Sequence, residues 1–321
     1  MRTTLTGSPA LGPLLARGAL LSPFKRPRPD ADFPRTRLHL PGVRVDLTRL
    51  AAYERVCGFA TGDDSLPLTY PHVLGFPPAM RLMSGRDFPL PLLGLVHTSI
   101  EITRSTVLKT TGEYELVVYV DGLAPHRRGT EAAVVTEVRT AGKVVWESRS
   151  TYLARHRTDG RTARTPADGP GQLPAHPARP PAAGGTPLAA VDPSTAVTEP
   201  APPAAVPLSL VPEPLPVRAD WRLGADVGRR YGAVSDDRNP IHLHPLTARL
   251  FGFPRPIAHG MWTVARCLAA HGTPPAVRMR AEFRAPVPLP GTVAYAAEGG
   301  RFELRGADRV HLTGEVYPLT S

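Results

Sequence analysis

The chain has 321 residues, 42% of them hydrophobic and 21% charged, which suffices for one large or two ordinary globular domains. Its 39 prolines are about 12% of the chain against an average of about 5%, so proline must gather in linkers or loops. The net charge is +10, and 38 basic residues minus three lysines leaves 35 arginines, a surplus that GC-rich coding alone produces. No dense basic run interleaved with aromatic residues occurs, so we do not expect nucleic acid as a partner. The charge instead favours a phosphate-bearing substrate or an acidic carrier protein.

Cysteine content and the N-terminal segment suggest where the protein works. Two cysteines, Cys57 and Cys267, are too few for a secreted domain stabilised by disulfides, so we expect a cytoplasmic protein. No His/Cys cluster has zinc spacing, so we expect no metal. No apolar stretch reaches the roughly 18 to 20 residues that cross a bilayer, so no membrane association is expected. Residues 1–37 loosely imitate a signal peptide, but Pro13 and Arg17 interrupt the apolar run. We expect a poorly ordered leader there.

The first half of the chain has the pattern of two helices followed by four strands. Apolar residues recur at helical spacing over 47–59, and a second short helix is expected over 77–83. Strand-like runs follow at 92–104, 113–123, 129–140 and 144–154. These elements define an expected first domain over 38–157.

Composition changes abruptly over 158–219, where aromatic residues vanish and prolines arrive among alanine, glycine and threonine. Such a stretch cannot bury enough apolar surface to offset the entropy of ordering it, so we expect a flexible Pro/Ala-rich linker. After it, helices are expected over 226–234 and 259–271. Strands are expected at 277–287, 292–298, 302–305 and 310–318, which completes a second domain over 220–321.

The same order of elements therefore occurs twice. A central helix followed by several antiparallel strands predicts the α+β class, with a curved sheet wrapped around a helix in each half. Two such units side by side would form a pseudo-dimer within one polypeptide.

Chemistry-bearing residues concentrate between the linker and the last helix. Asp237 and His242 lie five residues apart, and Pro240 breaks any helix between them, so a turn can bring both side chains to one side of a loop. A carboxylate beside an imidazole is a general acid/base pair near neutral pH. Ser235 and Asn239 are short polar residues that could orient the pair.

A second segment, Pro-Ile-Ala-His-Gly-Met, leads into an apolar helix. Gly260 would place a backbone N–H at the N-terminus of this helix, where unpaired donors and the helix dipole favour negative charge. An oxyanion forming on a thioester carbonyl would be stabilised there. His259 is expected either to start the helix or to contact the catalytic residues without carrying a proton itself.

Together these segments resemble the signature of the MaoC-like, or hydratase-2, family, which runs Ser-Gly-Asp-x-Asn-Pro-hydrophobic-His and then Pro-x-x-His-Gly-Met. Family members are hotdog-fold enzymes, so the resemblance implies a double hotdog that hydrates trans-2-enoyl thioesters or dehydrates (3R)-hydroxyacyl thioesters. Residue by residue, the catalytic Asp and His of the family fall on Asp237 and His242, and its oxyanion glycine falls on Gly260. The sequence departs from the pattern at Asp236, where the family usually has glycine; we expect a solvated turn residue there.

The first half is similar to the non-catalytic hotdog of two-domain family members, such as the actinobacterial 3-hydroxyacyl-thioester dehydratases. It lacks the Asn-Pro-x-His element, so one site per chain is expected. In such proteins the first half would house the acyl chain, and the candidates for this groove are Tyr70, Phe76, Ala79 and Phe253. His72 and His97 are expected to be packing or surface histidines.

The expected activity is that of a hydro-lyase in fatty-acid or related acyl metabolism. Its substrate would be a thioester of CoA or of acyl carrier protein, which brings its own pantetheine group, so no cofactor is needed. The resemblance is also compatible with a homodimer of double hotdogs. Two alternatives remain, a non-catalytic acyl-binding accessory subunit of a dehydratase and a hotdog thioesterase.

Overall fold

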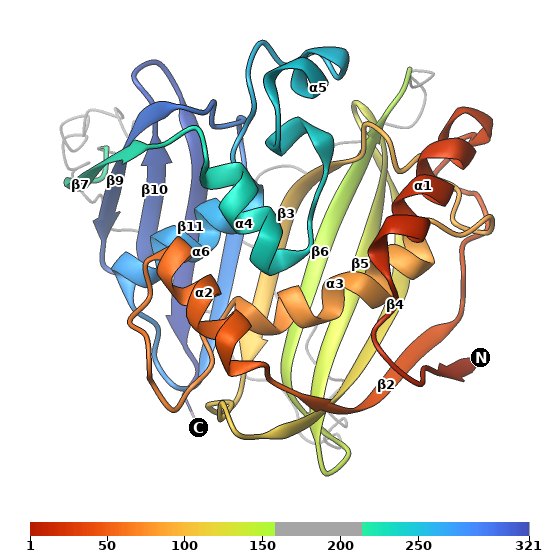
Figure 1. Ribbon diagram of the computed structural model, residues 1–321, viewed down its shortest axis with the longest axis horizontal. Helices are drawn as coiled ribbons and strands as arrows, with labels where there is room; N and C mark the ends of the chain where they lie inside the picture. The colour runs from red at the N-terminus through yellow and green to blue at the C-terminus, as the bar shows by residue number, and fades with distance from the viewer. Residues whose placement is uncertain (158–213, 321) are drawn as a thin grey trace, which may run out of the picture. The chain divides into compact units, whose positions relative to one another are not determined.

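Eleven strands form one continuous sheet in the computed structural model, which describes residues 1–157 and 214–320 (Figure 1). The strands are β1 (Arg2–Thr4), β2 (Arg37–Arg44), β3 (Val96–Arg104), β4 (Glu113–His126), β5 (Gly129–Thr140), β6 (Lys143–Arg155), β7 (Val217–Leu223), β8 (Val277–Phe283), β9 (Gly291–Glu298), β10 (Arg301–Arg305) and β11 (Val310–Pro318). Their order across the sheet is β1-β2-β4-β5-β6-β3-β8-β11-β10-β9-β7.

The same topology occurs twice along this sheet. Without β1, the first half has the order β2-β4-β5-β6-β3, and the second half repeats it as β7-β9-β10-β11-β8. The halves meet where β3 pairs with β8, with Ile100 opposite Ala281 and Ile102 opposite Met279. All four side chains are at most 1% exposed, so the seam belongs to the core. The predicted α+β double hotdog is confirmed.

Helices α2, α3 and α4 lie in front of this sheet in Figure 1. The helices are α1 (Leu11–Leu21), α2 (Leu47–Cys57), α3 (Tyr70–Met83), α4 (Val227–Ser235), α5 (Pro245–Leu250) and α6 (Gly260–His271), with 3₁₀ turns η1 (Ser22–Phe24) and η2 (Pro240–His242). In the first half α3 packs on β4 and β5, and in the second half α6 packs on β10 and β11. By position in the chain, α2 corresponds to α4, and α3 corresponds to α6.

Aromatic side chains of α2, α3 and α4 contact one another between the two halves. The ring of Tyr53 in α2 lies 5.1 Å from that of Tyr70 in α3 and 6.0 Å from that of Tyr231 in α4. The three side chains are at most 2% exposed. Because large aromatic side chains dominate core energetics, this cluster stabilises the contact between the halves as well as each half.

The expectation that residues 1–37 form a poorly ordered leader is wrong, because this segment contains β1, α1 and η1. β1 pairs in parallel with β2, and α1 packs against α3. Lys25 donates hydrogen bonds to three carbonyl oxygens, those of Gly85, Arg86 and Phe88, at 2.6–2.8 Å. The physical reason is that Pro13 falls in the first turn of α1, where its missing N–H costs no helical hydrogen bond.

Helix α3 differs from the sequence expectation at its start. It begins at Tyr70, seven residues before the expected start at Pro77, and continues through Pro77 and Pro78. The expectation placed proline at a helix start, where it is favoured, whereas packing of the buried face of α3 keeps the helix intact here.

The elements β2, β7 and α5 were not predicted either; β2 and β7 lie at the borders of the expected domains, and α5 lies within the second. β7 begins at Val217, so the second domain starts before residue 220. The expected linker otherwise falls on 158–213, outside the described residues. Within the described part, no helix is both long and apolar enough to span a bilayer.

Candidate active site

The loop after α4 carries the predicted carboxylate. Asp236 ends α4 in the left-handed conformation, with φ +61°, and Asp237 follows with its side chain 31% exposed. The N–H of Asp237 donates to Ser235 Oγ over 3.2 Å, and its Oδ1 accepts the N–H of Asn239 over 3.2 Å. Ser235 and Asn239 therefore hold the loop around Asp237, and their role in orienting the acid/base pair stays a prediction.

His242 closes the same loop in η2, because the Oδ1 of Asn239 accepts the N–H of Ile241 and starts this turn. The side chain of His242 is 7% exposed, and its Nδ1 lies 2.7 Å from the carbonyl oxygen of Ile257. A carbonyl only accepts, so Nδ1 carries the proton and Nε2 of the neutral ring keeps its lone pair. Burial lowers the pKa of His242, although the negative charge of Asp237 opposes this. The ring is thus neutral and basic at Nε2 near pH 7.

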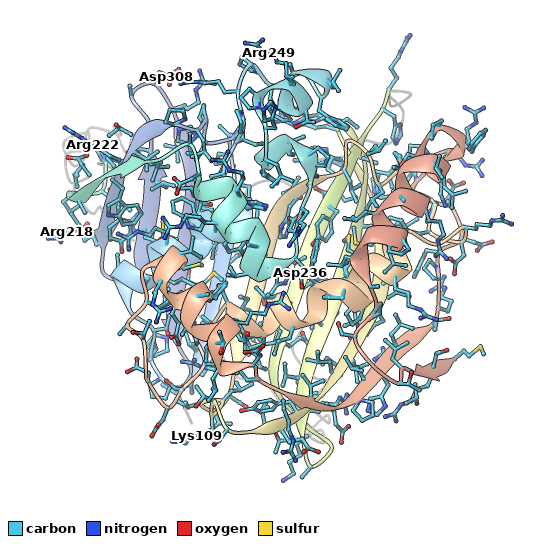
Figure 2. All side chains as sticks on the ribbon, viewed as in Figure 1. Lys109, Arg218, Arg222, Asp236, Arg249 and Asp308 are labelled. Carbon is cyan, nitrogen blue, oxygen red and sulfur yellow. The ribbon has the colours of Figure 1, made fainter. Side chains whose placement is uncertain are left out.

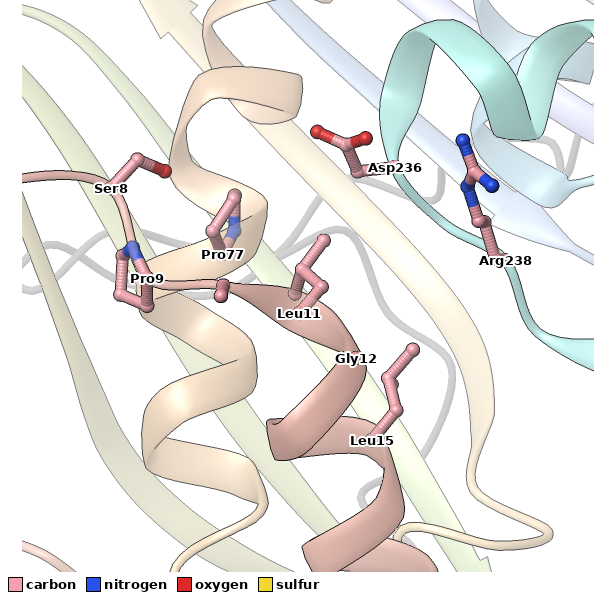
Figure 3. A pocket seen from close by; sticks show the side chains of 9 residues that line it. Ser8, Pro9, Leu11, Gly12, Leu15, Pro77, Asp236 and Arg238 are labelled. Carbon is pink, nitrogen blue, oxygen red and sulfur yellow. The ribbon is translucent and has the colours of Figure 1, made fainter.

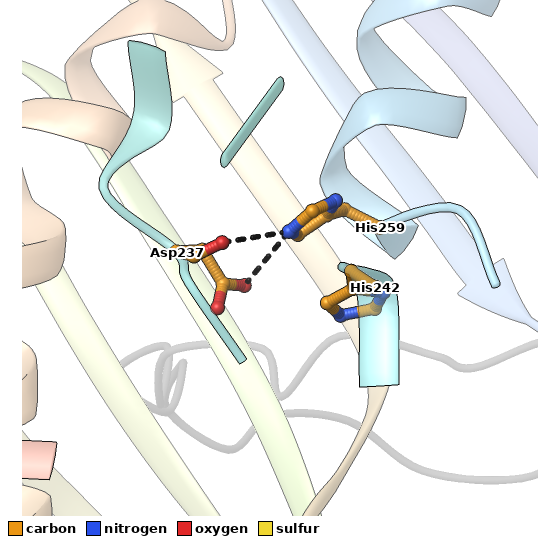
Figure 4. A group of neighbouring side chains, drawn as sticks. All are labelled: Asp237, His242 and His259. Atoms are coloured by element: carbon orange, nitrogen blue, oxygen red, sulfur yellow. Dashed lines mark hydrogen bonds and ion pairs between the residues drawn. The ribbon is translucent and has the colours of Figure 1, made fainter. Parts of the chain in front are cut away.

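His259 connects the two motif segments. Its Nε2 donates to the backbone oxygen of Asp237 over 2.8 Å and lies 4.0 Å from the carboxylate of that residue (Figure 4). The His259 ring stacks on that of His242, with centroids 3.6 Å apart. Burial lowers the pKa of His259 well below its usual value, and the neighbouring His242 lowers it further. His259 therefore holds the loop as a neutral ring.

Gly260 is the first residue of α6, next to His259, and its N–H belongs to the turn that lacks helical partners. A Cβ added to Gly260 would lie 2.8 Å from Cε1 of Phe283. A side chain here would therefore press on the Phe283 ring at the end of β8, so one of the two would have to shift. The unpaired N–H groups at the N-terminus of α6 favour a group with negative charge.

The first half also supplies residues to this site. The ring of His97 in β3 lies 4.7 Å from that of Phe283 and 4.6 Å from that of Tyr152 in β6. Burial has the largest effect on the pKa of both His72 and Tyr152, lowering the first and raising the second, and the negative charge of Asp237 raises both, so Asp237 lies near these two groups. His72 and His97 pack as expected, but the sequence missed that His72 and Tyr152 lie near Asp237. Only the seam between β3 and β8 reveals this.

The four acyl-groove candidates do not lie together on an open wall. Tyr70 is fully buried and Ala79 is 6% exposed, both in the core, whereas Phe76 and Phe253 are partly buried. Their contact with an acyl chain stays a prediction.

A pocket of 490 Å³ opens beside the loop that follows α4 (Figure 3). It is lined by Ser8, Pro9, Ala10, Leu11, Gly12, Leu15, Pro77, Asp236 and Arg238. The N-terminal segment that was expected to be disordered therefore forms one wall beside the site.

The charged residues Arg249 and Asp236 lie in different surroundings. Figure 2 shows Arg249 on α5 at the rim of the molecule and Asp236 between α4 and α3. Asp236 lies in the turn after α4 and is 34% exposed, as expected of a turn residue, but it also forms an ion pair with Arg49 that the sequence did not predict. The left-handed conformation explains the glycine that the family usually has, because glycine adopts a positive φ without strain.

One group among the described residues could hold a metal ion. Asp237, His242 and His259 each offer a ligand atom within 4.8 Å of the others. A carboxylate and two imidazoles suit several divalent cations. The Nδ1 of His242 and the Nε2 of His259 already bond to backbone oxygens, which leaves one nitrogen on each ring. The expectation that no metal takes part stays a prediction.

The buried histidines of the first half predict a loss of stability in acid. Burial lowers the pKa of His72 to about 4 and that of His97 to about 3, from 6.5. Below pH 6.5 the unfolded chain takes up protons that the folded chain refuses. Each histidine should therefore lower the free energy of unfolding by about 1.4 kcal/mol per pH unit, down to its folded pKa.

Urea unfolding of the wild type and His97→Phe at pH 7, 6 and 5 measures this effect. Phenylalanine keeps the stacking on Tyr152 and Phe283 but cannot be protonated, so the variant should lose less stability between pH 6 and 5. His126→Phe, at the end of β4, is the matched control. Equal pH dependence of all three proteins would contradict the prediction.

A double hotdog in which one half presents an Asp-x-Asn-Pro-x-His loop to a helix N-terminus has the architecture of a two-domain MaoC-like protein. Residues 211–312 match the MaoC like domain family. The chain is 35% identical over 276 residues to 3-hydroxyacyl-thioester dehydratase X of Mycobacterium tuberculosis, covering 85% of this chain and 84% of that protein. The chain therefore belongs to the MaoC-like dehydratase family.

Solved structures agree with this assignment. A crystal structure of HtdX of Mycobacterium tuberculosis superimposes with a TM-score of 0.67 at 30% identity, covering 88% of this chain and all of that one. A MaoC-like dehydratase from Phytophthora capsici, at 18% identity, shares the fold with a TM-score of 0.61, covering 91% of this chain and 97% of that one.

Proposed function

We propose that the protein is a hydro-lyase that adds water to trans-2-enoyl thioesters, or removes it from (3R)-hydroxyacyl thioesters, in acyl metabolism. The observation that carries the proposal is the geometry of His242. Its Nδ1–H is fixed by the oxygen of Ile257, and its neutral Nε2 shares a site with the carboxylate of Asp237. Similarity to a protein named as a 3-hydroxyacyl-thioester dehydratase supports the same reaction.

The chemistry follows from three groups. Asp237 orients a water molecule, and Nε2 of His242 takes a proton from it as its oxygen bonds to C3 of the enoyl group. The C2–C3 π electrons move toward the thioester carbonyl, whose growing negative charge is stabilised by the N–H of Gly260 and the positive end of α6. A proton then returns from the acid/base pair to C2. Water is consumed, no bond to sulfur breaks, and the pair ends in its starting state.

A crotonyl-CoA assay distinguishes the candidate activities. Hydration removes the ultraviolet absorbance of the conjugated enoyl thioester without releasing thiol. A thioesterase would release free CoA, which a thiol reagent detects. An accessory subunit would do neither. Hydration with no thiol release is the expected result, and thiol release or complete inactivity would overturn the proposal.

The proposal includes the surroundings of the reaction. The substrate carries CoA or the phosphopantetheine of acyl carrier protein, and the protein itself uses no cofactor. A cytoplasmic location is supported by Cys57 and Cys267, which are both buried as free thiols. Assembly as a homodimer of double hotdogs belongs to the same proposal and is tested by size-exclusion chromatography with light scattering.

The expectation that no metal takes part gives a separate prediction. Since general acid/base catalysis by Asp237 and His242 suffices, treatment with a chelator followed by gel filtration should leave kcat within error of the untreated protein. Added Zn²⁺ should inhibit, because it would occupy the three ligand atoms of the site. Loss of activity on chelation, with recovery on adding a metal, would contradict the prediction.

A further inference from the structure

Helix α2 belongs to the half without the catalytic loop, yet it contacts both segments that build the site. Nε of Arg49, in its first turn, donates to the carbonyl oxygen of Val234 over 2.7 Å. At its other end, the carbonyl oxygen of Val56 accepts the indole N–H of Trp262 over 2.8 Å. Val234 lies three residues before Asp237, and Trp262 lies two residues after Gly260. One helix of the first half thus holds the elements that carry the acid/base loop and the oxyanion glycine.

Arg49 makes a second contact at the residue next to Asp237. Its guanidinium pairs with the carboxylate of Asp236 while Nε holds Val234, so one side chain bonds to the last turn of α4 and to its cap. A planar guanidinium suits this double contact because its donors point in fixed directions. The charges of Arg49 and Asp236 both act on the hydroxyl of Tyr70, which is buried without a hydrogen-bond partner. The ion pair therefore lies against the core.

The backbone at Asp236 explains why this contact matters. Its φ of +61° is a conformation in which an L-residue other than glycine is strained, although aspartate tolerates it better than most. The carbonyl oxygen of Asp236 also accepts the N–H of Arg238 over 2.9 Å, which turns the chain around Asp237. If Asp236 relaxed, this turn and the direction of the Asp237 carboxylate would change together. Without Arg49, moreover, an uncompensated negative charge would stand next to the catalytic carboxylate.

We propose that Arg49 is a positioning residue of the site, which holds Asp236 in the left-handed conformation and thereby aims Asp237. The half that lacks a catalytic loop thus sets the geometry of the loop in the other half. This inference rests on the proposed function of Asp237. In this role Arg49 acts through Asp236 and Val234.

The test combines Arg49→Ala, Asp236→Gly and the double variant, with Arg55→Ala as the matched control on the exposed side of α2. We expect Arg49→Ala to lower kcat for crotonyl-CoA about tenfold while KM stays within about twofold, because the Asp237 carboxylate loses its orientation and substrate binding does not change. Asp236→Gly should keep most activity, because glycine adopts the positive φ freely and leaves no charge unpaired. In the glycine background, Arg49→Ala should cost only about twofold to threefold, because contacting residues act non-additively.

Hydrogen exchange supplies a readout that does not depend on activity. Amides over 236–242 should exchange at least about threefold faster in Arg49→Ala, and not in Arg55→Ala, because the local opening of the loop becomes easier. Should Arg49→Ala fail to fold, Arg49→Lys replaces it, since lysine keeps the charge and loses the double contact. Unchanged exchange, or the same loss of kcat with and without Asp236→Gly, would overturn the proposal. A wild type that does not hydrate crotonyl-CoA would refute the proposed function, and hydrogen exchange would still decide the role of Arg49.

Discussion

Asp237→Asn and His242→Ala should each lower the rate of enoyl-thioester hydration by about 10² to 10⁴-fold, since this is the range that positioned acid/base groups contribute. Asparagine is nearly isosteric with aspartate and its Oδ1 can still accept the N–H of Asn239, so the loop should keep its shape. Alanine at 242 removes the only nitrogen base that the loop itself presents. Because both groups act on the same water molecule in one step, the double variant should be little worse than either single one.

Initial rates with crotonyl-CoA, together with thermal melts, check this prediction. Asp30→Asn and His126→Ala are the matched controls, since they make the same chemical changes outside the site, and both should keep wild-type rates. A single variant that folds and keeps near-wild-type turnover would remove that residue from the mechanism. Losses that multiply in the double variant would show that Asp237 and His242 act in separate steps.

The turn from Asp237 to His242 and the helix that begins at Gly260 could be predicted because their information is local. Asp237, His242 and Gly260 lie within 24 residues, the proline between the first two forces a turn, and the apolar helix after the glycine follows from its periodicity. The twofold repeat of the fold was predictable for a similar reason, because each half carries its own helix and strand pattern. Local patterns determine secondary structure, and the repeated order then fixes the topology.

Contacts between distant segments could not be predicted in this way. Arg49 reaches Val234 across 185 positions of sequence, and His97 meets Phe283 only because β3 pairs with β8. Nothing in a single sequence marks which arginine of 35 finds a carbonyl oxygen in the other half. The ordered structure of the N-terminal segment was missed for the same reason, because α1 is stabilised by packing on α3 rather than by its own composition.

Gly228 shows how much of the site depends on such close approaches. It lies in the first turn of α4. A Cβ added to it would lie less than 3.0 Å from the carbonyl oxygen of His242 and 3.0 Å from the carbonyl carbon of the same residue. Helix α4 therefore packs directly on the backbone that carries the His242 imidazole. Only glycine permits this distance, since any side chain would push against main-chain atoms that cannot rotate away.

Gly228→Ala should consequently damage both stability and catalysis. Alanine favours a helix over glycine by about 1 kcal/mol, so propensity alone predicts stabilisation. Overpacking against His242 should outweigh this gain and lower the free energy of unfolding by about 1 to 3 kcal/mol. A displacement of the imidazole by about 1 Å should reduce kcat by about 10²-fold, since the geometry of proton transfer is lost.

Gly122→Ala in β4, where an added Cβ meets nothing within 4 Å, is the matched control and should keep wild-type activity. Urea unfolding and crotonyl-CoA hydration measure the two effects, and a Gly228→Ala protein with wild-type stability and rate would show that α4 does not fix the position of His242.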